Sequence, residues 1–425
     1  MLGECVVAGL GTRTLRVLAV PYGHALSHVS RPLEVAKELR KRGHEVVFAG
    51  GGRQLRHVEE AGFPAIRDLE MPHEVLFGRI RERKLRFILE GELRTLVDED
   101  LRVIREVRPD LVLTDGRISA RLSTRAAGVP HAAIVNVSST HHRAVPYVPV
   151  FGWVRPTWLR SLANRFNLWA EMAVFDRANP AFGRVARRLG LPPDVTATNC
   201  LEGNDLTLLP DLPELMPSQG LPPGHHYVGP ITFDGSHLPD PPWWSELLLR
   251  KESGARVVYF TLGTTGTREL FRSALRDLGG RDDLAVVVST GGQVDLPAPP
   301  ANVFVAEVLD GDRVMELADV VVCHGGNGTI YQALRHGVYV LGIPAIPDQE
   351  YNLRRAEALG IGARVHSVDL AGPGFLSRML SSKKSEEVLG ARGGGTGARF
   401  GADGIVKLLG GSAQGQEVGD AEDLG

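Results

Sequence analysis

A glycine-rich turn in the second half of the chain could bind an anion. It follows a buried apolar run, 320–323, and precedes residues with the apolar spacing of a helix. The turn consists of His324, Gly325, Gly326, Asn327, Gly328 and Thr329. Glycines let the backbone approach a ligand closely, and free N–H groups at a helix start, aided by the helix dipole, can hold a diphosphate. The imidazole and the threonine hydroxyl add donors. Taken alone, this could equally be a tight turn that needs glycine only for its geometry.

A carboxylate and an amide stand at the next strand-to-helix crossing. Asp348 and Gln349 follow the apolar run 338–343, whose carboxyl end would share a sheet edge with the glycine turn. Both side chains suit the hydroxyls of a sugar ring. Asp348 could also be no more than the N-cap of the helix that follows.

The rest of the chain alternates short apolar runs with stretches of helical apolar spacing. In the first half we expect strands at 15–20, 45–49, 111–114 and 132–137, and helices at 29–39, 85–107 and 117–127. In the second half we expect strands at 257–261, 284–289, 302–305, 320–323 and 338–343. This alternation predicts an α/β protein made of two Rossmann-like, doubly wound domains.

The length of the chain also favours two domains, because 425 residues exceed what one hydrophobic core usually supports. Proline-rich residues 179–242 have the composition of a connecting stretch, with a linker at about 210–242. We place the first domain at 1–228 and the second at 229–390. A glycine-rich tail, with one short helix and then disorder, would occupy 391–425. The cleft between the two domains is the expected ligand site.

The composition disfavours several classes of partner. The formal net charge of −2 gives no field for recruiting nucleic acid or an anionic membrane. No apolar stretch approaches the ~20 residues of a membrane span, and the N-terminus lacks a secretory pattern. We therefore expect a cytoplasmic protein without a transmembrane segment, and leave peripheral membrane contact and oligomeric state open. The three cysteines lack metal-ligand spacing, so no metal site is predicted.

The motifs of the second half resemble the donor signature of GT-B glycosyltransferases, in the family of the UDP-glycosyltransferases and the bacterial macrolide and antibiotic glycosyltransferases. That signature runs H-G-G-x-G-T, then an acidic residue, G-x-P and D-Q-x-x-N. The glycine turn, Gly337, Asp348, Gln349 and Asn352 stand at its separations. The resemblance implies two Rossmann-like domains facing across a cleft. It places the diphosphate on His324 and the glycine turn, and the donor sugar on Asp348 and Gln349.

The same resemblance assigns further residues. Segment 260–265 looks like a loop that contacts the donor phosphates, which adds Thr264. Counting back from Gly43, which matches the end of the family's first helix, places the catalytic histidine on His28. As a general base, His28 would take a proton from an acceptor hydroxyl, and Asp115 would orient it. Without the resemblance, a capping or exposed histidine and a turn-forming Asp-Gly pair would be the simpler interpretation.

The implied activity is an inverting, metal-independent transfer of a hexosyl group. A UDP- or dTDP-sugar would be the co-substrate, with no cofactor, and a small hydroxylated molecule would be the acceptor. The helix N-terminus and His324 would stabilise charge on the departing diphosphate. No DxD-type metal motif lies near the donor residues. Trp153 and Phe166 are candidate walls for an apolar acceptor, such as a natural product or a lipid.

The chain departs from the family pattern at the nucleoside. The Trp that usually stacks on the base is absent, and Leu309 would have to supply that contact. Gln332 replaces the acidic ribose ligand and can still accept through its amide oxygen. Three alternatives stay open: a non-catalytic homologue acting as a partner protein, a nucleotide-sugar epimerase or hydrolase on the same fold, and a cell-wall lipid glycosyltransferase.

Overall fold

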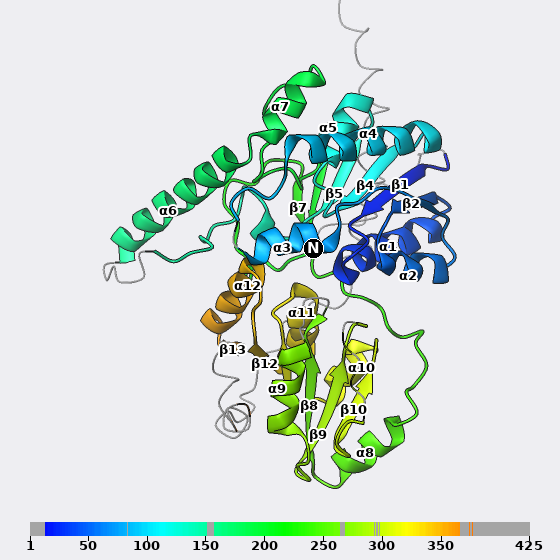
Figure 1. Cartoon of the computed structure of the whole chain (residues 1–425), viewed down its shortest axis with the longest axis vertical. Coiled ribbons are helices and arrows are strands. Elements are labelled where there is room, and N and C mark those ends of the chain that lie inside the picture. The colour runs from blue at the N-terminus through cyan, green and yellow to red at the C-terminus, as the bar shows by residue number, and fades with distance from the viewer. Residues whose placement is uncertain are drawn as a thin grey trace, which may run out of the picture.

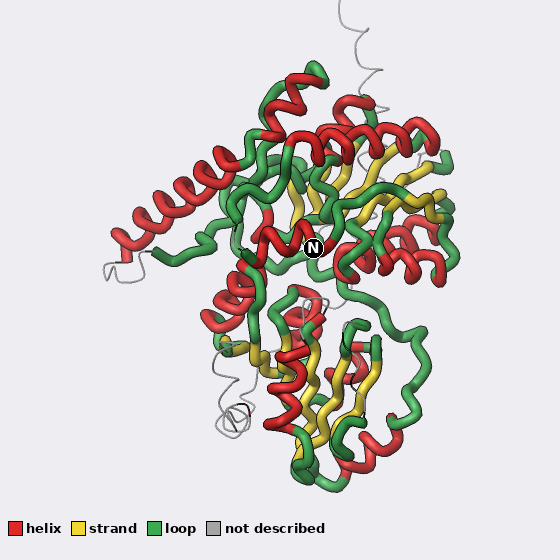
Figure 2. Tube along the Cα trace, in the orientation of Figure 1, coloured by secondary structure: helices red, strands yellow, loops and turns green. Residues whose placement is uncertain are grey.

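The computed structural model describes residues 13–82, 84–150, 157–263, 268–292, 294, 296, 298–365, 374 and 376. Within them the chain forms two β-sheets, one in each half, and every strand pair is parallel (Figures 1 and 2). Helices flank both sheets. The prediction of an α/β protein with two Rossmann-like sheets is confirmed.

The first sheet has the strand order β3-β2-β1-β4-β5-β6-β7. Its strands are β1 (Arg16–Pro21), β2 (Glu45–Gly50), β3 (Ala65–Arg67), β4 (Leu111–Asp115), β5 (His131–Ile134), β6 (Leu206–Leu209) and β7 (His225–Tyr227). The chain builds outward from β1 to β3 and then crosses to β4 on the other side of β1. The junction between β1 and β4 is therefore the topological switch point, where open α/β sheets bind ligands.

The helices of the first half connect these strands. They are α1 (Leu26–Lys41), η1 (Arg53–Leu55), α2 (Arg56–Glu60), α3 (His73–Arg81), α4 (Glu90–Val107), α5 (Ala120–Ala127), η2 (Val137–Ser139), α6 (Thr157–Ala178) and α7 (Ala181–Arg188). One end of α6 projects away from the body of the protein (Figure 1). None of the described helices is long and apolar enough to cross a membrane.

The second sheet repeats the arrangement with the strand order β10-β9-β8-β11-β12-β13. Its strands are β8 (Arg256–Thr261), β9 (Leu284–Ser289), β10 (Val303–Ala306), β11 (Val320–Cys323), β12 (Tyr339–Gly342) and β13 (Gly362–Arg364). Its helices are α8 (Trp244–Glu252), α9 (Arg268–Leu278), α10 (Gly311–Leu317), α11 (Asn327–Arg335) and α12 (Pro347–Ala358). Here the switch point lies between β8 and β11, beside the glycine turn.

The central strands are buried on both faces, which explains their continuous apolar sequence. All four residues of β11 are buried. Val321 and Cys323 belong to one hydrophobic cluster, whereas Val320 and Val322 belong to another, because successive side chains of a strand point to opposite faces. The strand therefore ends in a fixed position between two packed layers, and so does the turn that follows it.

The proline-rich stretch is more ordered than predicted. Helix α7 and strands β6 and β7 all lie within 179–242, and β6 and β7 extend the first sheet. The interpretation of this stretch as a connection was wrong for these elements. Strands of three or four residues are too short to show periodicity against the surrounding prolines. The boundary at Gly229 stays a prediction, and the tail at 391–425 lies outside the described residues.

Candidate active site

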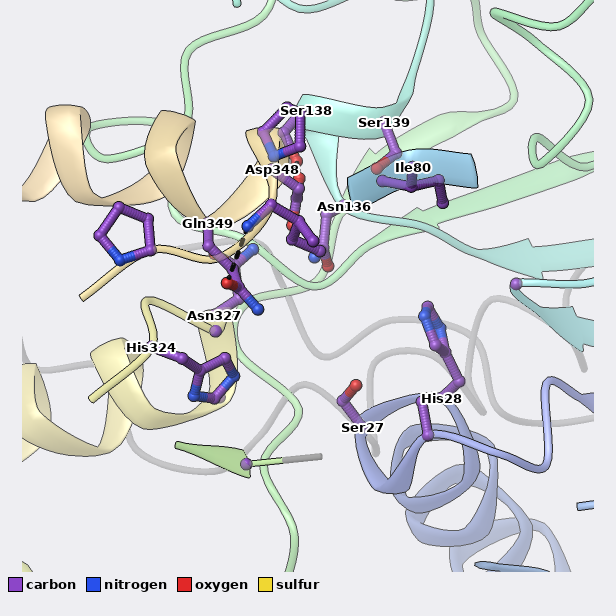
Figure 3. Close-up of a pocket in the computed structure, with 18 of the residues that line it drawn as sticks. Ser27, His28, Ile80, Asn136, Ser138, Ser139, His324, Asn327, Asp348 and Gln349 are labelled. Carbon is purple, nitrogen blue, oxygen red and sulfur yellow. Dashed lines mark hydrogen bonds between the residues drawn. The ribbon is translucent and has the colours of Figure 1, made fainter. Parts of the chain in front are cut away.

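A cavity of about 1290 Å³ lies between the two sheets, at the switch points of both (Figure 3). Residues that follow β1 and β4 line one side, and residues that follow β11 and β12 line the other. The predicted residues that line it are His28, Leu309, His324, Gly326, Asn327, Gly328, Thr329, Gln332, Asp348 and Gln349. The fold thus brings both predicted halves of the site to one space.

His28 and Asp115 form a close pair, as the sequence predicted. Asp115 ends β4 and stands opposite Pro21, the last residue of β1, while His28 lies in the first turn of α1 just beyond. The distance from His28 Nδ1 to Asp115 Oδ1 is 2.5 Å. A carboxylate can only accept, so Nδ1 carries the proton, and Nε2 is left as the basic nitrogen.

Arg31 is a member of this site that the sequence did not reveal. Its Nε and one terminal nitrogen donate to the two oxygens of Asp115, both at 2.7 Å, and its other terminal nitrogen donates to Asn136. The terminal nitrogen that bonds Asp115 also lies 3.2 Å from His28 Nδ1. Arg31 and Asp115 are both buried, so the guanidinium compensates the carboxylate that orients His28. Its position one helical turn after His28 is the only signal that sequence offered.

The glycine turn needs its glycines for shape as well as for ligand access. Gly325 has a φ of +89°, and a Cβ there would meet the Leu353 side chain at 2.7 Å. A Cβ on Gly326 would come within 2.5 Å of the His324 ring. Asn352 donates from Nδ2 to the Gly325 carbonyl and holds the turn from α12. The asparagine of the D-Q-x-x-N motif therefore has a structural use here.

His324 is a neutral donor and not a cation. Burial lowers the pKa of this imidazole to about 4, so it is uncharged at neutral pH. Its Nδ1 is buried without a hydrogen-bond partner among the described residues. A neutral ring can donate one hydrogen bond to a phosphate oxygen but adds no charge.

The N-terminus of α11 faces the cavity without a side-chain cap, because its N-cap is Gly326. The Asn327 side chain turns away and donates to Asp211 Oδ1 at 2.9 Å, which also accepts from Tyr331 at 2.9 Å. Burial raises the pKa of Asp211 to about 6. The backbone N–H groups of the first turn, with the hydroxyl of Thr329, are thus the groups that could receive an anion.

Asp348 and Gln349 are already engaged by the protein. Ser138 Oγ donates to Asp348 Oδ1 at 2.7 Å, so a residue of the first half holds the predicted sugar ligand of the second. Gln349 is buried and accepts from the backbone N–H groups of Ala345 and Ile346, capping its own helix. A donor sugar that bonds to Asp348 Oδ1 would share that oxygen with Ser138 or replace it there.

Of the remaining predicted residues, some line the cavity and others do not. Leu309 is buried and lines the cavity. Gln332 also lines it, and its side-chain amide lies close to Gly311. Phe166 is exposed and is not among the residues that line the cavity; α6 lines it instead with Ala170, Glu171, Val174 and Phe175. Thr264 and Trp153 lie outside the described residues.

One cluster among the described residues has metal-ligand chemistry: His142, Glu202 and His225, whose ligand atoms lie within 4.8 Å of one another. Arg121 already lies 3.5 Å from Glu202 Oε2, the oxygen that faces both imidazoles, and supplies positive charge there. None of the three residues lines the cavity. The cluster therefore has no direct part in the chemistry of the cavity.

The comparisons with known proteins agree with this geometry. Residues 257–376 match the glycosyltransferase family 28 C-terminal domain. In fold, the chain is similar to the spinosyn rhamnosyltransferase SpnG complexed with thymidine diphosphate, with a TM-score of 0.59 and 20% identity over 95% of this chain and 100% of that one. Fold and site together define a GT-B glycosyltransferase, and the resemblance inferred from the motifs is confirmed.

Two mycobacterial relatives specify the family. The chain is 36% identical over 357 residues to the PGL/p-HBAD biosynthesis rhamnosyltransferase of Mycobacterium bovis (strain BCG / Pasteur 1173P2), covering 83% of this chain and 77% of the relative. It is 30% identical over 270 residues to an inactive PGL/p-HBAD biosynthesis glycosyltransferase of the same strain, covering 63% of this chain and 72% of that one. The chain belongs to this family of glycosyltransferases.

Proposed function

We propose that the protein transfers a 6-deoxyhexose, such as rhamnose, from a dTDP-sugar to a hydroxyl of an apolar acceptor, with inversion and without a metal ion. The observation that carries the proposal is the placement of the His28–Asp115 pair and the glycine turn in one cavity, on opposite halves of the chain. The relative and the solved neighbour are both named rhamnosyltransferases, and the neighbour binds thymidine diphosphate. These names support the choice of donor.

In this reaction the acceptor hydroxyl attacks the anomeric carbon on the face opposite the diphosphate. His28 Nε2 takes the hydroxyl proton as the new C–O bond forms, and Asp115 stabilises the resulting imidazolium. The bond between the anomeric carbon and the phosphate oxygen breaks, and its electron pair leaves with the diphosphate. The N–H groups of α11 and the neutral His324 stabilise that charge by hydrogen bonding.

The nucleobase of the donor would occupy the cavity beside Val308 and Leu309, where aliphatic contact replaces aromatic stacking. The apolar acceptor would lie along the inner face of α6, against Val174 and Phe175. An acceptor of the PGL/p-HBAD type, as in the names of the relatives, would suit this wall.

A panel of dTDP-, UDP- and GDP-sugars scored by thermal shift, with EDTA present, tests the donor. We expect dTDP and dTDP-rhamnose to raise the melting temperature most, and release of dTDP to require an added acceptor. Loss of donor without an acceptor would favour an epimerase or hydrolase. The inactive relative keeps the partner-protein alternative open, and the absence of a shift with every nucleotide would favour it.

A further inference from the structure

Helix α6 carries an unusual concentration of exposed apolar side chains. Of the fifteen large apolar residues that are exposed among the described residues, six lie on this one helix. They are Trp158, Leu159, Leu162, Phe166, Trp169 and Val174. Two more, Val148 and Val150, lie on the segment before it. Scattered exposed apolar residues are ordinary on a protein surface, but such a cluster marks a surface that something covers.

The spacing places most of these side chains on one outer face. Residues 158, 162, 166 and 169 recur at intervals of four, four and three, which is a single stripe of an α-helix. Trp158 and Trp169 are 68% and 62% exposed. An adjoining side of the helix packs on the body through the buried residues Leu168 and Met172. A helix that is apolar on two sides is expected to be buried on both.

The exposed charge of α6 has one sign. Its basic residues Arg165 and Arg177 are both exposed, beside the apolar stripe. Both of its carboxylates turn inward: Glu171 accepts from the N–H groups of Tyr147 and Val148 at 2.9 and 2.8 Å, and Asp176 accepts from Thr198. The net charge of −2 for the whole chain therefore hides a locally cationic, aromatic surface.

We propose that this outer face of α6 docks the protein on an anionic lipid bilayer. Tryptophan side chains favour the interface between acyl chains and headgroups, and exposed arginines attract anionic headgroups. The helix would lie in the plane of the membrane surface. A second copy of the chain fits less well, because a two-fold contact would set the exposed arginines of one helix against those of the other.

The location of the helix adds a second argument for a lipid surface. Its inner residues Ala170, Val174 and Phe175 line the cavity, and its outer face is the apolar surface. One element thus joins the cavity to the docking face, so a molecule with lipid chains could reach the cavity from the membrane. The docking itself does not depend on the proposed transfer reaction.

The test is co-flotation of the full chain with vesicles of phosphatidylcholine alone or mixed with phosphatidylglycerol. The wild type should float with the mixed vesicles, and added salt should weaken this. Trp158→Ser/Leu162→Ser/Trp169→Ser should lower the bound fraction about tenfold or more, because three apolar anchors are lost. The matched control, Leu248→Ser/Leu249→Ser/Leu359→Ser, removes exposed leucines from the second half and should bind as the wild type does.

A charge variant keeps the test decisive if the triple variant melts at a lower temperature. Arg165→Glu should weaken binding to the mixed vesicles several-fold, whereas Arg272→Glu, at an exposed position of α9, should not. Equal flotation of the wild type and both α6 variants would overturn the proposal. The proposal would also be overturned if the wild type did not float with the mixed vesicles. This holds both for a monomeric protein and for a dimer that the triple variant dissociates.

Discussion

Ser138 Oγ lies 2.7 Å from Asp348 Oδ1, and this hydrogen bond joins the two halves of the chain across the cavity. Tyr147 lies 3.4 Å from the same oxygen, and its hydroxyl also donates to the Ser138 carbonyl at 3.0 Å. The carboxylate expected to bind the donor sugar is thus occupied by the first half of the chain. If Asp348 binds the donor sugar as the family resemblance implies, the donor and the contact between the halves compete for this oxygen.

This competition predicts opposite effects of two substitutions on donor affinity. Asp348→Asn should weaken binding of the dTDP-sugar about tenfold or more, since a hydrogen bond to a charged group contributes about 1.5–3 kcal/mol. Ser138→Ala should tighten it, because the sugar no longer displaces the serine. Calorimetric titration with a donor analogue measures both. If Ser138→Ala weakened binding as much as Asp348→Asn, the two residues would act together on the donor and the competition would be refuted.

Arg31 should support catalysis by holding Asp115 in place beside His28. In Arg31→Gln the buried carboxylate loses its compensating charge and the paired hydrogen bonds of the guanidinium. We therefore expect both kcat and the melting temperature to fall. Arg31→Lys retains the charge and should restore part of the melting temperature, while kcat stays low because an ammonium group cannot make the paired contact. A kcat equal to that of the wild type in both variants would mean that Arg31 has only a structural role.

His131 should make the fold sensitive to acid. Burial lowers the pKa of this imidazole to about 3, below the ordinary value of about 6.5 in the unfolded chain. The unfolded state therefore binds an additional proton between these values, and stability falls as the pH drops, by up to about 1.4 kcal/mol per pH unit for this group. His324, with a pKa of about 4, adds to the effect.

Urea unfolding at pH 6.5 and pH 5 measures this linkage. His131→Leu should lose about 1.6 kcal/mol less stability than the wild type over that interval, because the unfolded imidazole is about half protonated at pH 6.5 and almost fully protonated at pH 5. His226→Leu, at an exposed position of β7, serves as the control and should follow the wild type. Identical pH slopes for the wild type and His131→Leu would rule out the linkage.

The strongest sequence predictions were those that rest on a strand followed by a turn. Run 320–323 and its glycines predicted a buried strand, a turn and a helix start, and the structure has all three. His28 and Asp115 come together because β1, which precedes the helix of His28, pairs at the switch point with β4, which ends in Asp115. The glycine turn could be found from its strand-turn-helix pattern, whereas the choice of His28 and Asp115 also needed the family resemblance.

Other features depend on packing that spacing does not encode. Arg31 has no motif, and only the fold shows that it is turned toward Asp115. Gln349 matches the donor motif but caps its own helix, because its side chain is close to the N–H groups of Ala345 and Ile346. Phe166 is exposed because α6 projects beyond the body, and an apolar residue in a helix is normally expected to be covered.

The general base is the centre of the proposed mechanism, and one comparison tests it most directly. Steady-state turnover of dTDP-rhamnose, with a hydroxylated acceptor, is measured for the wild type and for His28→Ala, alongside the thermal shift that dTDP produces. The proposed mechanism predicts a fall in kcat of about 100- to 10,000-fold with an undiminished thermal shift, because His28 contributes to proton transfer and not to diphosphate binding. Unchanged turnover in His28→Ala would contradict it.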